Sequence, residues 1–171
     1  MEDPEKFDFS MAQGEFINVF GSGSNKWDCI VTCFFIDTAH NVLDYMQTFN
    51  KILKVGGLWV NIGPLHWHYS EQPYEVQVQI SLEEIEHLVP KFGFRFRKKY
   101  MKETSYTGRL NCMHNMKYES VFFSAVKVSE FEPPSQAPPQ WLWYNFSKTK
   151  VNTDMLHTEI KHIILDFCFN P

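Results

Sequence analysis

Three side chains that often act as general acids and bases follow two apolar segments of this chain. Asp37 ends the apolar run 27–36, and His66 and His68 stand in the segment after a second run, residues 58–62. In α/β sheets, ligands bind in the crevice at the carboxyl ends of the strands. If both runs are strands of one such sheet, these three residues are candidates for catalysis.

Each of these residues also has a structural interpretation. Asp is a favoured N-cap residue, so Asp37 could do no more than begin the helix that follows it. His66 and His68 could pack their loop without any chemical role. The local pattern leaves both interpretations open.

The segment between the two runs has the periodicity of an amphipathic helix. Lys51 and Lys54 would lie in its last turn, and Gly56-Gly57 would end it. A strand, a helix and a strand in this order form two parallel strands with a right-handed crossover. Asp37 and the His66–His68 loop should therefore lie close together, although they are about thirty positions apart. The apolar residues that define the helix are Val42, Tyr45, Met46, Phe49, Ile52 and Leu53.

A different pattern follows the second run. Ser81 and Glu84 form a capping box before a predicted helix over residues 82–89. Two strand-like segments, 94–103 and 117–128, flank a polar connection, which indicates an antiparallel pair appended to a parallel sheet. The chain is therefore predicted to be an α/β protein.

This order of elements resembles the second half of a Rossmann-like S-adenosylmethionine-dependent methyltransferase. The turn 53–57 is common to that class, and three other segments are more specific. These are 27–41 (WDCIVTCFFIDTAHN), 63–68 (GPL followed by His68) and 116–119 (MKYE). Together they resemble the carnosine N-methyltransferase family over about residues 7–128. The resemblance implies a partial Rossmann-like sheet of parallel strands with an antiparallel C-terminal strand pair.

The resemblance also implies an activity. In this family a methyl group passes from S-adenosylmethionine to an imidazole nitrogen of carnosine, which gives anserine. Asp37 and His68 match positions that contact the substrate imidazole, and they are the implied catalytic residues. Tyr106 and Tyr118 match aromatic positions that line the dipeptide site, although strands favour tyrosine in any case.

Three further residues match positions beside the methyl donor: Glu15, Phe16 and Cys33. Without the resemblance, Cys33 would be read as a small buried apolar residue. This chain departs from the family pattern twice. Glu15 stands where the family has an aspartate, and Met116 stands where the family has a second tyrosine.

The implied roles agree with the chemistry of imidazole. A free imidazole has a pKa near 6.5, so much of it is already neutral and nucleophilic at pH 7. The enzyme must mainly orient the ring and accept a proton. Asp37 on the opposite ring nitrogen would hold the tautomer, and His68 would hydrogen-bond the substrate or take the proton.

The glycine-rich turn that holds the methyl donor in such enzymes is not found in this sequence. The segment 21–24 precedes a predicted strand instead of following one, so it is interpreted as a flexible insert. Residues 1–128 are therefore expected to be a partial methyltransferase domain without its donor-binding half. The alternative is a non-catalytic binding or interaction module that pairs with another chain.

The rest of the chain differs in composition. Residues 129–140 read as a proline-rich linker, and residues 141–171 form an apolar tail. The tail either covers a surface that the missing half leaves open or is an unrelated addition. The residues that would line a short helix in it are Met155, Leu156, Ile160, Ile163 and Ile164.

Composition excludes several other classes. At 171 residues and 44% hydrophobic residues the chain has enough apolar side chains for a core, and its net charge of −4 disfavours nucleic acid as a partner. No apolar run has the length of a membrane span, and no metal site is expected, since Cys112 and His114 provide too few ligands. Four unpatterned cysteines favour a reducing compartment, the cytoplasm and also the nucleus. The expected partners are carnosine and a second copy of the chain.

Overall fold

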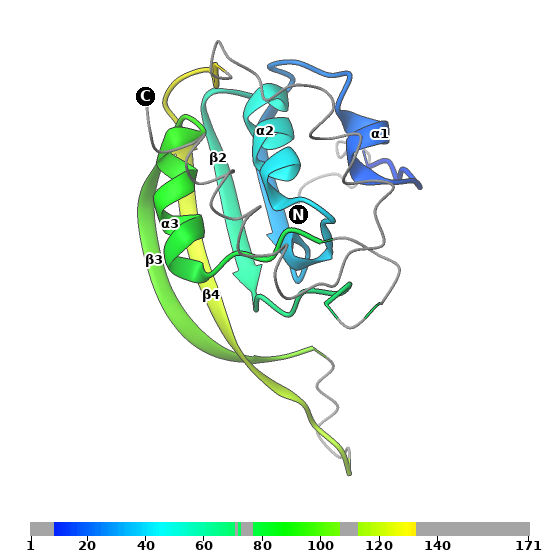
Figure 1. The fold of residues 1–171 in the computed structure, drawn as a ribbon. Coiled ribbons are helices and arrows are strands. Elements are labelled where there is room, and N and C mark those ends of the chain that lie inside the picture. The colour runs from blue at the N-terminus through cyan, green and yellow to red at the C-terminus, as the bar shows by residue number, and fades with distance from the viewer. Residues whose placement is uncertain (1–8, 71, 73–76, 107–112, 133–171) are drawn as a thin grey trace, which may run out of the picture.

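The computed structural model describes residues 9–70, 72, 77–106 and 113–132. Its centre is a four-stranded sheet in the order β1-β2-β4-β3 (Figure 1). β1 and β2 are parallel, whereas β4 is antiparallel to both of its neighbours. This is the predicted α/β sheet with an antiparallel C-terminal pair, which is confirmed. The strands are β1 Trp27–Cys33, β2 Leu53–Gly63, β3 Phe94–Ser105 and β4 Lys117–Lys127.

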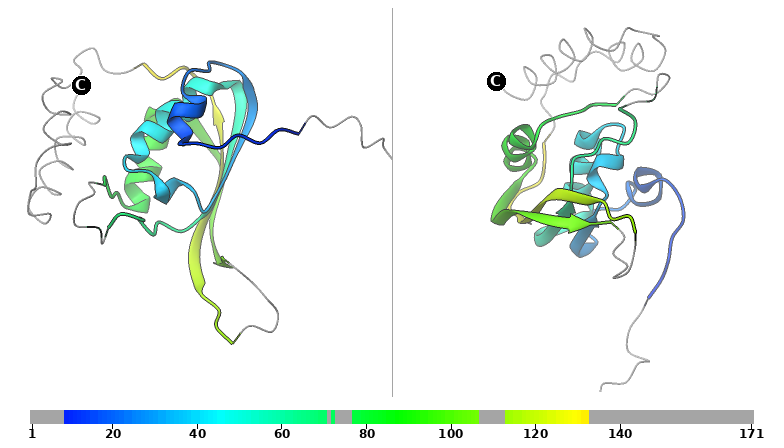
Figure 2. Two further views of the ribbon diagram at one scale, coloured as in Figure 1. Left: turned by 90° about the vertical axis from the view of Figure 1, so that its right-hand side faces the viewer. Right: turned by 90° about the horizontal axis from the view of Figure 1, so that it is seen from below.

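The described helices all lie on one side of this sheet (Figure 2). They are α1 Phe16–Phe20, α2 Val42–Ile52 and α3 Leu82–Lys91. The core between helices and sheet is centred on Trp59 of β2, whose ring centroid lies 4.8 Å from those of Phe49 and Phe123 and 5.4 Å from that of Phe94. Burying each such side chain contributes about 1.5–3 kcal/mol to folding, so these rings hold α2 against the sheet.

The chain leaves β1 earlier than the apolar run indicated. The strand ends at Cys33, because Phe34 adopts φ 49° and turns the backbone out of the extended conformation. A short 3-10 helix, Ile36–Thr38, follows. Asp37 therefore stands in this turn and not at the last position of the strand. The N-cap of α2 is Asn41, whose side chain accepts a hydrogen bond from the Leu43 amide, so the capping role considered for Asp37 is wrong.

The end of α2 also differs from the prediction. The helix stops at Ile52, and β2 begins at the next residue, where Leu53 pairs with Trp27. The pair Gly56-Gly57 lies inside β2, in an irregularity after which the register resumes at Leu58. Helix periodicity continued through Leu53, so the pattern alone placed the boundary too late.

The second half follows the prediction more closely. The capping box is present, since the Ser81 hydroxyl accepts from the Glu84 amide and the Glu84 carboxylate accepts from the Ser81 amide. α3 continues two residues beyond the predicted end, to Lys91, with Pro90 in its last turn. Pro90 removes only its own amide donor there, and the Phe92 amide still donates to Leu88 at 3.0 Å.

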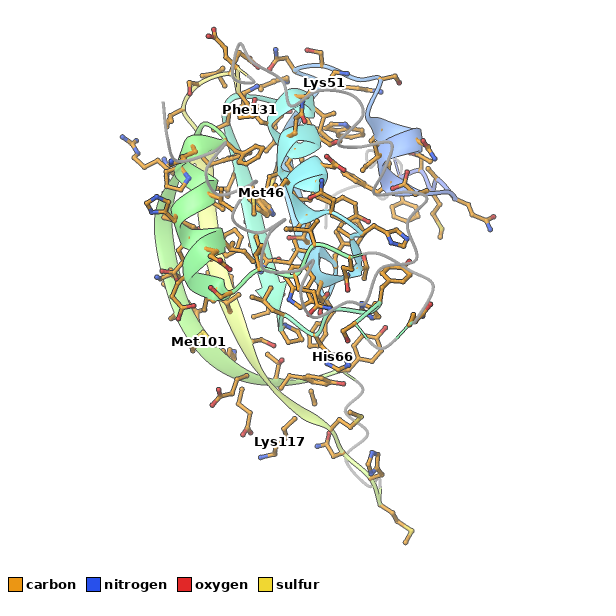
Figure 3. The ribbon with its side chains drawn as sticks, in the orientation of Figure 1. Met46, Lys51, His66, Met101, Lys117 and Phe131 are labelled. Carbon is orange, nitrogen blue, oxygen red and sulfur yellow. The ribbon has the colours of Figure 1, made fainter. Side chains whose placement is uncertain are left out.

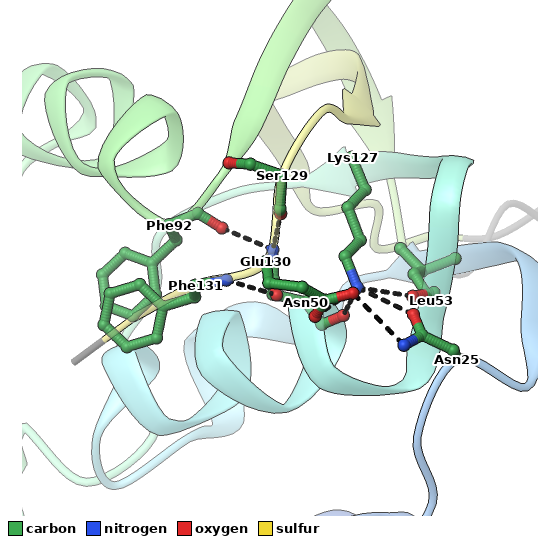
Figure 4. Close-up of polar contacts among 8 residues, drawn as sticks. All are labelled: Asn25, Asn50, Leu53, Phe92, Lys127, Ser129, Glu130 and Phe131. Atoms are coloured by element: carbon green, nitrogen blue, oxygen red, sulfur yellow. Dashed lines mark hydrogen bonds and ion pairs between the residues drawn. The ribbon is translucent and has the colours of Figure 1, made fainter.

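A buried lysine joins the carboxyl end of α2 to the rest of the fold (Figure 4). The side chain of Lys127, the last residue of β4, is 0% exposed. Its ammonium donates to the carbonyls of Asn50 and Leu53 at 2.7 and 2.8 Å, and to side-chain oxygens of Asn25 and Glu130 at 3.0 and 2.9 Å. A cation at this place neutralises the partial negative charge of the helix end.

Asn50 extends the same cluster toward α3. Its side-chain amide donates to the carbonyls of Phe92 and Ser129 at 2.8 and 2.9 Å, and its oxygen accepts from the Phe131 amide at 2.9 Å. The rings of Phe92 and Phe131 stack at 4.4 Å. Gly93 is required beside them, because a Cβ there would lie 2.8 Å from the Asn50 amide nitrogen and 2.5 Å from the Ser129 carbonyl oxygen.

Residues 133–171 lie outside the described residues, and so do most of the predicted linker and all of the predicted tail. The first linker residues, through Glu132, run along the Asn50 cluster. Among the described residues, no helix has the length and hydropathy to span a membrane.

The Lys127 cluster predicts a difference between two lysines that both form ion pairs. Lys127→Met removes the only charge that these four acceptors share, and we expect it to lower the free energy of unfolding by about 3–5 kcal/mol. Lys54→Met is the control, because Lys54 pairs with Asp28 on the surface and should cost less than about 1 kcal/mol. Urea denaturation of both variants measures the difference. Similar losses in the two would contradict a structural role specific to Lys127.

Candidate active site

Asp37 is a buried carboxylate near the carboxyl end of β1. Its side chain is held on one side only, because Oδ2 accepts a hydrogen bond from the His66 amide at 3.0 Å. The residue is 2% exposed, and Oδ1 has no hydrogen-bond partner among the described residues. A buried carboxylate oxygen normally has a partner, so this one marks a place where a donor from a ligand could bind.

His68 lies against the backbone of the same residue. The His68 amide donates to the Asp37 carbonyl at 3.2 Å, and ring Nδ1 lies 3.3 Å from the same oxygen. A carbonyl oxygen can only accept, so Nδ1 carries the proton in this contact, and in the neutral form of the ring Nε2 is the acceptor. The expected proximity of Asp37 and His68 is therefore confirmed. His66, which is labelled in Figure 3, lies in the loop after β2, and its ring centroid is 6.4 Å from that of His68.

Gln77, which the sequence analysis did not select, connects the turn that contains Asp37 to the loop that contains His68. Gln77 is buried, and its amide nitrogen donates to the carbonyls of Asp37 and Ala39 at 3.3 and 2.7 Å. Its oxygen accepts from the Tyr69 amide at 3.1 Å. Gln77 thus connects the 3-10 turn to the histidine loop. No periodicity or motif surrounds it, and only the tertiary structure reveals its position.

The surroundings of Asp37 change its proton affinity. Burial raises the pKa of the Asp37 carboxyl above its ordinary value, although the hydrogen bond from the His66 amide and the charges of His68 and His66 act in the opposite direction. Desolvation disfavours the ionised form and is the largest of these influences. A carboxyl of this kind is a candidate proton acceptor.

The two predicted substrate tyrosines meet through one phenylalanine. The ring of Phe34 lies 5.3 Å from that of Tyr106 and 5.6 Å from that of Tyr118, both edge to face. Phe34 can turn toward the β3–β4 pair because Gly63 lies beside it, where a Cβ would come within 3.0 Å of the Phe34 nitrogen and Cα. Met116 accepts a hydrogen bond from the Tyr118 hydroxyl through its sulfur, at 3.8 Å.

The residues predicted to contact the methyl donor lie toward α1. Glu15 is the N-cap of this helix, and its two carboxylate oxygens accept from the Ile17 and Asn18 amides at 3.0 and 2.8 Å. Phe16 packs against the rings of Phe35, Tyr45 and Phe49 at 5.3–5.5 Å. Cys33 is exposed, so its reading as a small buried residue is wrong.

The five residues 33–37 connect all of these groups. Phe34 contacts the tyrosines, Phe35 contacts Phe16, and Asp37 holds the histidine loop. Asp37 and His68 therefore form one cluster, while Tyr106 and Tyr118 form a second cluster, and no direct contact between the two clusters is described. His40 precedes the N-cap of α2, and its ring stacks on that of Tyr69 at 3.8 Å. Within the described ranges, no group of three or more His, Cys, Asp and Glu side chains could hold a metal ion.

The chain matches a protein-family model described as "CARME: Carnosine N-methyltransferase" over residues 1–129. It is 43% identical over 121 residues to a Rattus norvegicus protein named "Carnosine N-methyltransferase", covering 70% of this chain and 30% of the relative. It is 35% identical over 133 residues to "Carnosine N-methyltransferase unmet" of Drosophila melanogaster, covering 77% and 29%. The chain thus spans about 30% of the length of these curated relatives.

Two solved structures are also similar to this chain. One, described as "Conversion of a Disulfide Bond into a Thioacetal Group during Echinomycin Biosynthesis", has a TM-score of 0.46 at 8% identity, covering 84% of this chain and 58% of that chain. The other, "crystal structure of M1.HpyAVI-SAM complex", has a TM-score of 0.33 at 14% identity, covering 71% and 57%.

The raised pKa of Asp37 predicts a pH dependence of stability. The native state holds this proton more tightly than the unfolded state, so stability is lost as pH rises from the ordinary carboxyl pKa through the folded one. Asp37→Asn cannot ionise, and its oxygen can still accept from His66. We expect this variant to lack that loss, so that its stability relative to the unchanged chain increases between pH 3 and pH 8.

Urea denaturation across this pH range checks the expectation. Asp28→Asn is the control, because Asp28 lies on the surface beside Lys54. A pH profile of Asp37→Asn that runs parallel to that of the unchanged chain would contradict the burial argument.

Proposed function

We propose that this chain, which belongs to the carnosine N-methyltransferase family, carries the side of the active site that binds and orients the imidazole of carnosine. Family membership, expected from the sequence, is confirmed by the match over residues 1–129. The chain spans only about 30% of the rat and mouse relatives, so the methyl transfer as a whole is part of the proposal.

The observation that carries the proposal is the free oxygen of Asp37. Oδ2 is held by the His66 amide, so the carboxylate has a fixed orientation, and Oδ1 has no described partner. The N–H of a neutral imidazole would satisfy Oδ1. This hydrogen bond would select the tautomer in which the other ring nitrogen has its lone pair free for attack.

His68 and Asp37 can share the proton that the reaction releases. S-adenosylmethionine, when bound, supplies the methyl group that the free ring nitrogen takes. A methylated imidazole that still has its N–H is cationic, and loss of this proton to Asp37 Oδ1 restores the neutral ring. Burial raises the pKa of Asp37, which makes its carboxylate a stronger proton acceptor than an ordinary aspartate. Nε2 of His68 is a second acceptor close by, as the contact of Nδ1 with the Asp37 carbonyl indicates.

The tyrosine cluster can contact the remainder of the substrate. Tyr106 is 68% exposed and Tyr118 is half-buried, and Phe34 holds both rings next to the segment that contains Asp37. Tyrosine faces also favour a cation, such as the imidazolium formed during the reaction. In the proposal, Asp37 and His68 therefore bind the ring while Tyr106 and Tyr118 line the dipeptide.

The residues assigned to the donor differ in how they could contact it. Cys33 is exposed and Phe16 is half-buried, so both can contact a bound nucleoside. Each carboxylate oxygen of Glu15 accepts an amide of α1 and keeps a second lone pair that a donor group of the ligand could use. As the structure stands, Glu15 supports α1 and through it the position of Phe16.

Calorimetric titration of the purified 171-residue chain with carnosine tests the proposal. The chain should bind carnosine, and it should not bind β-alanyl-alanine, which lacks the ring. Asp37→Asn should weaken the affinity for carnosine at least about tenfold, which corresponds to one charge-assisted hydrogen bond of about 1.5 kcal/mol. Asp44→Asn, on the exposed side of α2, is the matched control and should leave the affinity unchanged.

Two outcomes would count against this function. Equal affinity for the two dipeptides would mean that the ring is not recognised. A folded chain that binds neither would favour the alternative of an interaction module without a substrate site.

The donor should bind this chain weakly on its own. Without the backbone amides of a glycine-rich turn, at least two charge-assisted hydrogen bonds to the donor are lost, which costs about 3 kcal/mol. We expect the affinity for S-adenosylmethionine to be about a hundredfold lower than that of the rat relative titrated alongside. Equal affinities would show that this chain contains a donor site outside the residues named above.

A further inference from the structure

The side of the sheet opposite the helices has an apolar surface, which we name the open face. Ser124, which pairs with Val60, and Lys98, which pairs with Ser124, interrupt this surface on β4 and β3. Its residues alternate along each strand with those that face the helices. Val31 pairs with Val60, and Ile62 pairs with Phe122, which in turn pairs with Tyr100. The exposed and half-buried apolar residues of this face are Cys29, Val31 and Cys33 of β1, Leu58, Val60 and Ile62 of β2, Phe122 of β4 and Tyr100 of β3.

The described part of the chain leaves this face largely uncovered. Val31 is 68% exposed and Tyr100 is 40% exposed, and both cysteines are exposed as well. The other four side chains are half-buried, and none of the eight packs against the hydrophobic core. The helices cannot cover them, because α1, α2 and α3 all lie on the other side (Figure 2).

An apolar surface of this extent is unusual on a sheet that contains parallel strands. Such sheets are normally covered on both faces, and large exposed apolar patches mark places where another segment or molecule binds. Most of the apolar residues of the open face lie on β1 and β2, and Phe122 and Tyr100 extend the face onto β4 and β3. It therefore requires a partner with an apolar surface of similar length.

The tail of this chain has the properties of such a partner. Residues 141–171 lie beyond the family match, which ends at residue 129. In a helix, Leu156, Ile160, Ile163 and Ile164 would form one apolar stripe, with Lys161 and His162 away from it. A helix over residues 155–167 would be about 20 Å long, which matches the width of a four-stranded sheet.

The linker is long enough for the tail to reach this face. The described chain ends beside Phe131, which stacks on Phe92 at the end of α3. Residues 133–140 include four prolines and would extend about 25 Å at about 3.1 Å per residue. This reach exceeds the spacing of about 10 Å between a sheet and a layer packed on it, so the linker can lead the tail from one side of the sheet to the other.

We propose that residues 141–171 dock on the open face, with the apolar stripe of the tail covering Val31, Val60 and Ile62. This inference shares Cys33, at the end of β1, with the residues assigned to the methyl donor. It otherwise uses the face of the sheet and not the strand ends where Asp37 lies. The tail would thus form the second layer that covers the sheet, on the side opposite α1, α2 and α3.

Thiol accessibility tests the proposal in the full-length chain. With Cys112 and Cys168 replaced by serine, the remaining thiols, Cys29 and Cys33, both report on the open face. We expect them to react slowly with a maleimide, and to react at least about tenfold faster when Ile160→Asp and Ile163→Asp disrupt the stripe. His162→Asp, on the polar side of the predicted helix, is the control and should change nothing.

A reciprocal experiment places the reporter on the tail. With Cys29, Cys33 and Cys112 replaced by serine, Cys168 should react faster after Val31→Asp on the open face. Val55→Asp is the matched control, because Val55 is 60% exposed but lies in the irregular segment of β2 outside the open face. Circular dichroism of each variant confirms that it is folded.

Three results would overturn the proposal. Fast labelling of Cys29 and Cys33 in the unchanged chain would show that nothing covers the face. Protection that survives the tail substitutions would assign the cover to another segment. Protection that disappears on dilution would assign it to a second copy of the chain.

Discussion

The buried ammonium of Lys127 is the interaction on which the arrangement of this domain depends. Its four acceptors come from the segment before β1, the end of α2, the start of β2 and the segment after β4. A charge without solvent is tolerated only if its hydrogen bonds are satisfied, so these four segments cannot move apart independently. Lys127 also explains why α2 passes directly into β2, since the carbonyls of Asn50 and Leu53 both point at the same cation. The carboxyl end of α2 is thereby fixed relative to the sheet.

The opposite end of the same strands has a different electrostatic character. Here the buried charge is the Asp37 carboxylate, with one oxygen satisfied and one without a described partner. At the Lys127 end every hydrogen bond is made, and the burial of charge stabilises the fold. At the Asp37 end burial raises the pKa and costs stability once the group ionises. Functional sites often retain such a cost, because the unsatisfied group is the one that binds the substrate.

The segment 33–37 positions the side chains of the candidate site around Asp37. A turn at Phe34, with φ 49°, sends successive side chains toward the tyrosines, toward α1 and toward the histidine loop. An extended strand would alternate its side chains between only two directions. The segment 33–37 therefore connects these three groups and also provides the carboxylate of Asp37. Gln77 keeps this segment attached to the histidine loop.

Local sequence patterns determined most of the helices and strands of this protein. Apolar periodicity predicted α2 and the strands, and the pair Ser81 and Glu84 predicted the start of α3, because caps and amphipathic faces depend on residues a few positions apart. The strand-helix-strand order also predicted that Asp37 and His68 would meet. Tertiary structure alone decided where β1 and α2 end, since Phe34 turns beside Gly63 and the α2 terminus is held by a lysine of β4. Tertiary structure also decided the role of Gln77, whose hydrogen bonds join residues 8 to 40 positions away. Glu15 was found to be the N-cap of α1, where its carboxylate accepts hydrogen bonds from backbone amides. Contacts between distant segments have no local signature, so they became visible only once the chain was folded.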